Sequence, residues 1–156
     1  MEYSGEERFE NVPEEIWDAL TNPEFLCQCF PGVDRVAHVD SRSATVVVRP
    51  GFSFIRGTLE VKFEFGELNA PVHGDVSIEL KGIGISAWFE ARFQISPCQG
   101  GSRVAWSVRE QELGGLLKAV SPGLIQAAGQ KVALDTWSSI RSRLSPLSGT
   151  EGPAIT

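Results

Sequence analysis

The residues that decide the fold are 12–32, with the sequence VPEEIWDALTNPEFLCQCFPG. Pro13 suits the first position of a helix, and the acidic pair behind it suits the positive end of a helix dipole. The same pattern recurs at Pro23, where Asn22 can cap a second helix. A Pro-Gly pair then signals a turn. We therefore predict two short helices in direct succession, over residues 13–20 and 23–29.

Strands are expected on both sides of this helical segment. A short charged strand, residues 1–10, precedes it. Between residues 33 and 111 apolar and polar residues alternate, most clearly over 55–65, where every second residue from Leu59 to Phe65 is apolar. Tight turns rich in Gly, Pro, Asn and Asp separate about six such strands. This pattern indicates an antiparallel meander with one apolar face.

The last third of the chain predicts one long helix. Apolar residues recur with a helical period from Ile125 to Leu144, after a Ser121-Pro122 start signal. At about 1.5 Å per residue this helix can cross a whole sheet and cover its apolar face. Residues 145–156 are rich in Ser, Gly and Pro and are expected to form a flexible tail. The expected organisation is α+β, with one domain over residues 1–144.

The composition limits the kinds of partner. The chain has 156 residues, with 14 Lys and Arg against 20 Asp and Glu, and a net charge of −6. Nucleic-acid binding needs a basic footprint, so this acidic balance argues against it. No apolar run approaches the roughly 20 residues that span a bilayer, and the N-terminus lacks the basic and apolar pattern of a signal peptide. We expect a cytoplasmic protein with no integral membrane segment.

The predicted sheet and long helix bring together side chains of unequal size. The sheet supplies large inward residues, and the middle of the helix supplies small ones. Such a combination either lets the helix approach closely, with Phe rings filling the core, or leaves an apolar cavity. A cavity rich in Phe and Trp suits an isoprenoid, a quinone or an acyl chain better than a sugar or a nucleotide. The residues expected to line it are Phe25, Leu26, Phe30, Phe63, Phe65, Phe89, Phe93, Trp106, Ala128, Gly129, Ala133 and Trp137.

The two short helices are expected to lie across one end of this site. Short helices are marginal by themselves, because nucleation is costly and packing alone holds them. We therefore expect residues 21–32 to act as a moving lid.

No set of residues in the sequence converges on catalysis. His38 and His73 fall beside expected turns, and a surface position suits both. Three carboxylates fall on the polar face of strands, so no acid and base are paired: Glu60, Glu64 and Glu90. We expect no catalytic residues and no enzyme.

Cofactor and metal motifs are equally weak. Residues 82–87 spell G-x-G-x-x-A, but strand alternation continues on both sides, so the glycines indicate a bend or bulge and not a dinucleotide site. Cys27 and Cys29 lack a second Cys or His pair and are expected to be plain thiols, as is Cys98. We expect neither a cofactor nor a metal. Trp88 falls on the solvent face, where it marks either a partner contact or packing at a sheet edge.

The order of these elements resembles the START/Bet v 1-like (SRPBCC) helix-grip superfamily, and within it the CoxG-like family, named after a component of carbon monoxide dehydrogenase. The resemblance covers roughly residues 1–144 and is most specific at the N-terminus. Its motifs there are Gly5-Glu6, residues 12–20, Asn22-Pro23-Glu24-Phe25-Leu26 and Cys29-Phe30-Pro31-Gly32. Weaker matches follow at Gly57-Thr58-Leu59-Glu60-Val61, with Glu60 where Gly is usual, at Gly82-Ile83-Gly84, at Gly114-Gly115-Leu116 and over residues 124–144.

The resemblance implies a helix-grip fold, a curved antiparallel sheet of about seven strands wrapped on the long C-terminal helix. It also implies an accessory role in the maturation or membrane recruitment of a molybdenum hydroxylase of the carbon monoxide dehydrogenase type. Several relatives carry a C-terminal membrane anchor, whereas residues 145–156 have no lipid-seeking stretch. A peripheral position at the inner face of the membrane is compatible with this role. The superfamily implies no shared catalytic residue.

Three interpretations of function follow. The first is an accessory protein that binds a hydrophobic small molecule. The second is a cavity enzyme of the polyketide cyclase or dehydratase type, which would need an ionisable residue facing the cavity. The third is a ligand-free interaction module, which would need a filled core and a contiguous exposed patch around Trp88.

Overall fold

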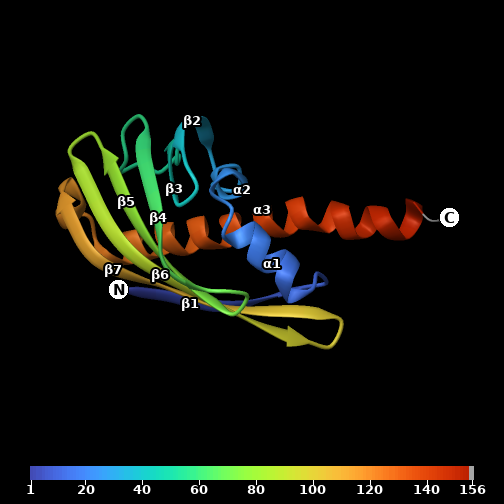
Figure 1. Cartoon of the computed structure of the whole chain (residues 1–156). Coiled ribbons are helices and arrows are strands. Elements are labelled where there is room, and N and C mark those ends of the chain that lie inside the picture. Colours follow the sequence, from blue (N-terminus) through green and yellow to red (C-terminus); the bar gives the residue numbers. More distant parts are fainter. Residues whose placement is uncertain (155–156) are drawn as a thin grey trace.

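Seven antiparallel strands form one sheet in the order β1-β7-β6-β5-β4-β3-β2. The structure is a computed structural model that describes the backbone of residues 1–154 and the side chains of residues 1–144. The sheet is strongly curved, and its concave face wraps around one long helix (Figure 1). The strands are β1 (Glu2–Phe9), β2 (Val33–Val39), β3 (Ser43–Val48), β4 (Leu59–Asn69), β5 (His73–Gly82), β6 (Ile85–Cys98) and β7 (Gly101–Gly115). The predicted helix-grip fold is confirmed.

The two consecutive short helices follow β1 as expected. α1 spans Pro13–Leu20, and α2 spans Pro23–Cys27, two residues less than the predicted second helix. The Asn22 side chain accepts hydrogen bonds from the amides of Glu24 and Phe25, so it caps α2 as its sequence position suggested. Both helices lie on the concave side of the sheet, beside the long helix.

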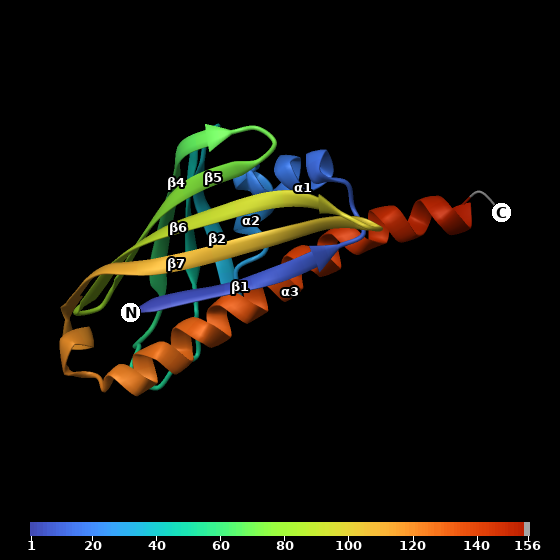
Figure 2. The same cartoon turned by 90° about the horizontal axis from the view of Figure 1, so that it is seen from below.

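The long helix α3 runs over Pro122–Ala154, after a 3-10 turn, η1 (Leu116–Ala119). It crosses the whole concave face, as the view from below shows (Figure 2). The tail expected over residues 145–156 falls on residues whose side chains lie outside the described part of the chain. Its flexibility stays a prediction.

Alternation along the strands sets the direction of their side chains. In β4, Leu59, Val61, Phe63 and Phe65 are buried, and the residues between them are exposed. The buried residues of all the elements join into one hydrophobic cluster between the sheet and the helices. The apolar face predicted from the sequence is therefore the concave face.

Two sequence expectations about strand ends are wrong. β4 begins at Leu59 and not at Ile55, because residues 49–58 form an irregular apolar loop with no ladder partner on β3 or β5. The glycines around Ile83 mark no bend or bulge within a strand. Gly82 pairs with Ile85, so Ile83 and Gly84 form a tight hairpin turn, in which Gly84 has a φ of +71°.

An irregularity elsewhere in the sheet does affect its inner face. The register between β6 and β7 shifts after Trp88, so that Phe89 pairs with Glu110 and Trp88 pairs with Glu112. One extra residue on β7, Gln111, is accommodated there. Glu110 lies on the same side of β7 as Val104 and Trp106, which are buried, and therefore faces the interior.

Candidate functional site

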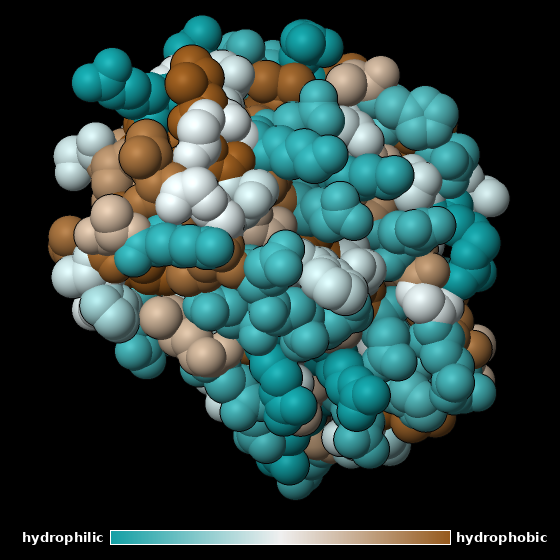
Figure 3. Space-filling view, turned by 90° about the vertical axis from the view of Figure 1, so that its left-hand side faces the viewer, coloured by the Kyte–Doolittle hydropathy of each residue, from teal (hydrophilic) through white to brown (hydrophobic). Residues whose placement is uncertain are grey.

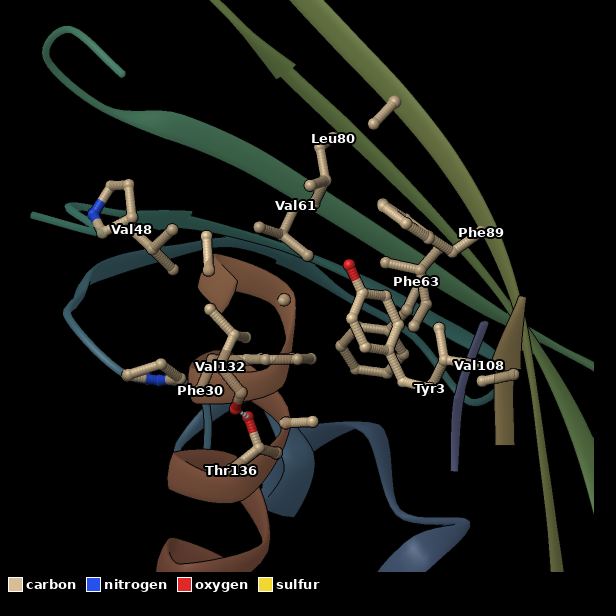
Figure 4. Close-up of a pocket in the computed structure, with 18 of the residues that line it drawn as sticks. Tyr3, Phe30, Val48, Val61, Phe63, Leu80, Phe89, Val108, Val132 and Thr136 are labelled. Atoms are coloured by element: carbon tan, nitrogen blue, oxygen red, sulfur yellow. Dashed lines mark hydrogen bonds between the residues drawn. The ribbon is translucent and has the colours of Figure 1, made fainter. Parts of the chain in front are cut away.

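A cavity of about 310 Å³ lies between α3 and the concave face of the sheet. Its walls come from strands β1 and β3 to β7, from the end of α1, from α2 and the residues after it, from the loop 49–58, from η1 and from α3 as far as Ile140. In the close-up, Tyr3, Phe63 and Phe89 on the sheet side face Val132 and Thr136 of α3 (Figure 4). Nearly all of the lining side chains are aliphatic or aromatic. The sheet and the helix thus enclose space instead of closing on each other completely.

The structure brings together ten of the twelve residues predicted to line a cavity. They are Leu26, Phe30, Phe63, Phe89, Phe93, Trp106, Ala128, Gly129, Ala133 and Trp137. That they bind a ligand stays a prediction.

Phe25 and Phe65 do not line the cavity. Phe25 lies on a different face of α2 from its neighbour Leu26, since successive residues of a helix point about 100° apart. Phe65 lies one inward step beyond Phe63 and packs edge-on against it, with ring centroids 6.1 Å apart. Both rings contribute to the filled part of the core.

The loop 49–58 supplies wall residues that the sequence pattern did not predict. Pro50, Phe52, Phe54 and Ile55 all line the cavity, and the rings of Phe52 and Phe54 stack with centroids 5.7 Å apart. A loop has no periodicity from which an inward face could be predicted. Only composition could have predicted their position, because four apolar residues in a short turn-rich segment are expected to pack against another apolar surface.

Both predicted consequences of the small residues on α3 occur, at different positions. A Cβ atom on Gly129 would overlap the ring of Tyr3, so this glycine permits close approach by a β1 side chain. The Tyr3 hydroxyl donates a hydrogen bond to the carbonyl of Ile125 at 3.2 Å. Ala128 and Ala133, by contrast, border the open space.

Few polar groups face the interior near the cavity. Trp106 is 6% exposed and lines the cavity, yet its Nε1 has no hydrogen-bond partner among the described residues. Its ring lies against Gly5 and 6.0 Å from the ring of Trp137. The Thr136 hydroxyl donates to the Val132 carbonyl at 2.7 Å and keeps its lone pairs free to accept (Figure 4). The indole Nε1 itself lies beside Gly5 of β1 and is shielded from the open space.

Glu110 is a further inward polar residue that the sequence analysis missed. One carboxylate oxygen, Oε1, is buried and has no hydrogen-bond partner within the described part of the chain. Burial first, and the nearby charge of Glu110 second, raise the pKa of Tyr3, so its hydroxyl stays protonated and able to donate. Alternation continued two residues beyond Val108 would have predicted an inward Glu110.

The histidines and the outward carboxylates lie away from the cavity. His38 is exposed and lies 3.1 Å from Asp40. His73 contacts the Asn69 side chain at 2.9 Å at the start of β5. Glu60 and Glu64 are exposed on the convex face, and Trp88, 42% exposed, donates from Nε1 to Ser77 and Glu90 there.

Cys27 and Cys29 are free thiols buried in and just after α2, and Cys98 is a half-buried free thiol at the end of β6. Cys27 and Cys29 are each 1% exposed, and Cys29 donates a hydrogen bond to the Phe25 carbonyl. Burial raises the pKa of Cys29 to about 11, so the thiol is protonated and a poor nucleophile at neutral pH. The described residues contain no cluster of three or more His, Cys, Asp or Glu side chains placed to hold a metal ion.

Comparison with known proteins identifies one protein family and one fold. The model of the CoxG family, whose members are described as a subunit of carbon monoxide dehydrogenase, matches residues 5–145. No curated protein matches the chain. No helix in the described part of the chain is long and apolar enough to cross a membrane.

Similar solved structures share the fold at low sequence identity. A conserved protein from Geobacillus kaustophilus is 16% identical, with a TM-score of 0.82 over 93% of this chain and 95% of that one. Ara h 8.0201 is 13% identical, with a TM-score of 0.66 over 92% and 95% of the two chains. DynU16, from the dynemicin biosynthetic locus, is 12% identical, with a TM-score of 0.61 over 92% of this chain and 47% of its own. At these identities the similarity establishes the fold alone.

Proposed function

The chain belongs to the CoxG family, whose model spans residues 5–145, and on this premise we propose that it binds a hydrophobic small molecule between α3 and the sheet. The observation that carries the proposal is the cavity of about 310 Å³ with its almost wholly apolar wall. A pre-formed apolar cavity of this size is typical of small-molecule sites. The ligand class that fits is an isoprenoid, a quinone or an acyl chain.

The few polar groups near the cavity narrow the ligand further. A buried N–H without a partner is costly, so we infer that a small shift of the Trp106 ring lets it donate to a ligand that carries a carbonyl or another acceptor. The Thr136 and Tyr3 hydroxyls lie on the same wall, but each already donates its proton to a backbone carbonyl and can only accept from a ligand. A quinone or a fatty acyl group offers Trp106 an acceptor, which a pure hydrocarbon does not.

We further propose that the protein is an accessory factor and not an enzyme. Membership of the CoxG family supports a role in the maturation or recruitment of a molybdenum hydroxylase of the carbon monoxide dehydrogenase type. Such a role places it in the cytoplasm, at least transiently at the inner face of the membrane.

A cavity enzyme of the cyclase or dehydratase type is the alternative. Tyr3 and Glu110 are the ionisable pair nearest to such a role. The Tyr3 hydroxyl, however, is already bonded to the Ile125 carbonyl, and the lining residues offer no nucleophile with a base. Binding therefore has more support than catalysis.

Native mass spectrometry of the purified full chain tests the proposal. We expect an adduct of a few hundred daltons that organic extraction releases and that carries a carbonyl. Ala133→Phe adds a ring inside the cavity and should abolish the adduct while leaving the melting temperature close to that of the wild type.

A matched control keeps the test specific. Ala127→Phe adds the same ring on the exposed side of α3 and should retain the adduct. An Ala133→Phe protein that melts far lower and still carries the adduct would contradict the proposal, because the site would then be close-packed core, where overpacking costs about 1–3 kcal/mol.

A further inference from the structure

One tryptophan on the convex face of the sheet is exposed to solvent. Trp88 is 42% exposed, although folded chains bury most of the surface of an average tryptophan. Its strand, β6, lies between β5 and β7, so packing at a sheet edge does not explain its position. Seen from the left-hand side of Figure 1, the surface of the molecule is mostly hydrophilic (Figure 3). An exposed indole on an inner strand is a candidate contact for a partner, because tryptophan is enriched at the centre of protein interfaces.

The indole of Trp88 is held in one orientation. Its Nε1 donates to the Ser77 hydroxyl and to the Glu90 carboxylate, both at 3.0 Å. Because this N–H is already satisfied, a partner can cover the ring without leaving a buried donor unpaired. Because the side chain is already ordered, contact with a partner costs little further conformational entropy. Trp88 therefore presents a preformed aromatic surface.

Two carboxylates flank this ring. Trp88 pairs with Glu79 of β5 on one side and with Glu112 of β7 on the other. Directly paired residues of an antiparallel sheet point to the same face, with Cβ atoms about 5 Å apart. Glu79 and Glu112 are both exposed, and neither has a hydrogen bond or an ion pair with any residue whose side chain the structure describes. The ring thus lies between two uncompensated negative charges.

The outward positions around these three residues are acidic on balance. Glu60, Glu64 and Glu90 add three more carboxylates, against the basic residues Lys62, Lys81 and Arg109. Arg109 lies 3.6 Å from Glu2 of β1, so one of these cations is already paired. Such a surface repels a nucleic acid or an anionic lipid and attracts a cation. The chemistry around Trp88 therefore favours a partner with a positively charged side chain.

We propose that this face docks a partner protein that presents an exposed arginine, with the guanidinium stacked on Trp88 and hydrogen-bonded to Glu79 or Glu112. An arginine fits better than a lysine, because its planar guanidinium both stacks on an aromatic ring and forms paired hydrogen bonds with a carboxylate. The neighbours of Trp88 along β6, Ala87 and Phe89, line the cavity on the opposite face. The docking therefore goes beyond the proposed function and does not depend on a bound ligand.

Titration of the isotope-labelled full chain with a tetra-arginine peptide, followed by NMR, tests the proposal. The chain has four tryptophans, and the indole N–H signal that is missing from Trp88→Leu identifies Trp88. We expect this signal to shift, together with the amides of residues 77–79, 88–90 and 110–112, while the amides of α1 stay unchanged. A tetra-lysine peptide should bind more weakly, and a neutral tetra-citrulline peptide should cause no shift.

Two variants separate the contribution of the ring from that of the charges. Trp88→Leu removes the aromatic surface, and Glu79→Gln with Glu112→Gln removes the flanking charges. Each should weaken binding of the tetra-arginine peptide roughly three- to fivefold. The glutamine variant keeps the size of both side chains, so it tests the proposal even if Trp88→Leu destabilises the sheet.

A matched control tests for general electrostatic attraction between the acidic chain and the peptide. Glu14→Gln with Glu15→Gln removes two exposed carboxylates from α1 and should bind the peptide as the wild type does. The proposal is wrong if the largest shifts fall on α1, if this control weakens binding equally, or if the citrulline peptide binds as well as the arginine peptide.

Two further measurements distinguish other occupants and the proposed function. Sedimentation of the free chain should show a monomer; a dimer that Trp88→Leu abolishes would mean that a second copy covers Trp88, which would overturn the proposal. Uptake of a fluorescent fatty acid reports the cavity alone, so Trp88→Leu should keep it, whereas Ala133→Phe should lose it and still bind the peptide. A wild type that takes up the fatty acid but ignores the tetra-arginine peptide would overturn the docking and leave the proposed function intact.

Discussion

Tyr3 and Gly129 decide how much of the interior stays open. The ring of Tyr3 occupies the place that a side chain at position 129 would need, and its hydroxyl fixes it to α3 through the Ile125 carbonyl. Without this contact the same space would belong to the cavity. One glycine and one tyrosine thus set a boundary between packed core and open site.

Gly129→Ala should therefore destabilise the protein, although alanine favours a helix by about 1 kcal/mol over glycine. The new Cβ displaces Tyr3 and its hydrogen bond, and we expect a net loss of about 1–3 kcal/mol in chemical denaturation. Gly123→Ala, with nothing within 4 Å of the added atom, should be neutral or stabilising. In a Tyr3→Leu background, Gly129→Ala should cost much less free energy of unfolding than it does in the wild type. If the losses from the two substitutions instead add in the double variant, the contact between these residues is not the cause.

Trp106→Phe tests whether the ligand carries an acceptor. The change keeps an aromatic ring on Gly5 and removes the N–H that has no partner among the described residues. A carbonyl-bearing ligand should bind about 3–10-fold more weakly, in line with one lost hydrogen bond, and a hydrocarbon of equal length should bind unchanged. Trp88→Phe, on the convex face, should alter neither affinity in a titration followed by fluorescence. Equal losses for both ligands would mean that the indole contributes shape alone.

At the scale of elements, two segments compete for the role of gate. The sequence favoured residues 21–32, because short helices are marginal. The structure shows Cys27 and Cys29 at 1% exposure there, whereas the loop 49–58 has no ladder partners on β3 or β5 and places half-buried Phe rings against the cavity. Segments with few buried contacts open most easily.

Hydrogen exchange can distinguish between the two candidate gates, residues 49–58 and residues 21–32. We expect ligand binding to slow amide exchange most in residues 49–58, less in residues 21–32 and hardly at all in residues 59–65 of β4. The order follows the burial of each segment without ligand. Slowing confined to residues 21–32 would instead make α2 the lid.

At the scale of the whole molecule, the local patterns of the sequence predicted most of the fold. Capping residues and prolines located α1 and α2, and alternation located the strands and their inward faces. The same alternation placed Phe63, Phe89 and Phe93 on the cavity wall. What it could not predict depends on contacts between distant segments: the Tyr3 ring on Gly129, and the loop 49–58 against the β5–β6 hairpin turn. Periodicity carries no information about such contacts.

The cavity also predicts how the whole molecule responds to its ligand. Apolar volume left unfilled lowers stability, so the cavity of about 310 Å³ makes the ligand-free protein less stable than the filled one. Protein stripped of ligand by organic extraction and refolding should melt several degrees lower than the protein as purified. Adding the extracted ligand back should restore the melting temperature, with a shift that grows with concentration. Ala133→Phe should show neither the loss nor the recovery.

The pairing of β1 with β7 affects how the chain can fold while it is being synthesised on the ribosome. Glu2 to Phe9 pair with Arg109 to Ser102, so the strand that is synthesised first finds its partner last. At ~5–20 residues per second, roughly 5–20 s of translation separate the two strands. During that interval Tyr3 and Phe9 have neither a sheet nor α3 to cover them. Until β7 and α3 have emerged, these side chains stay exposed, and a ribosome that stalls before Gly101 leaves a product that cannot close its core.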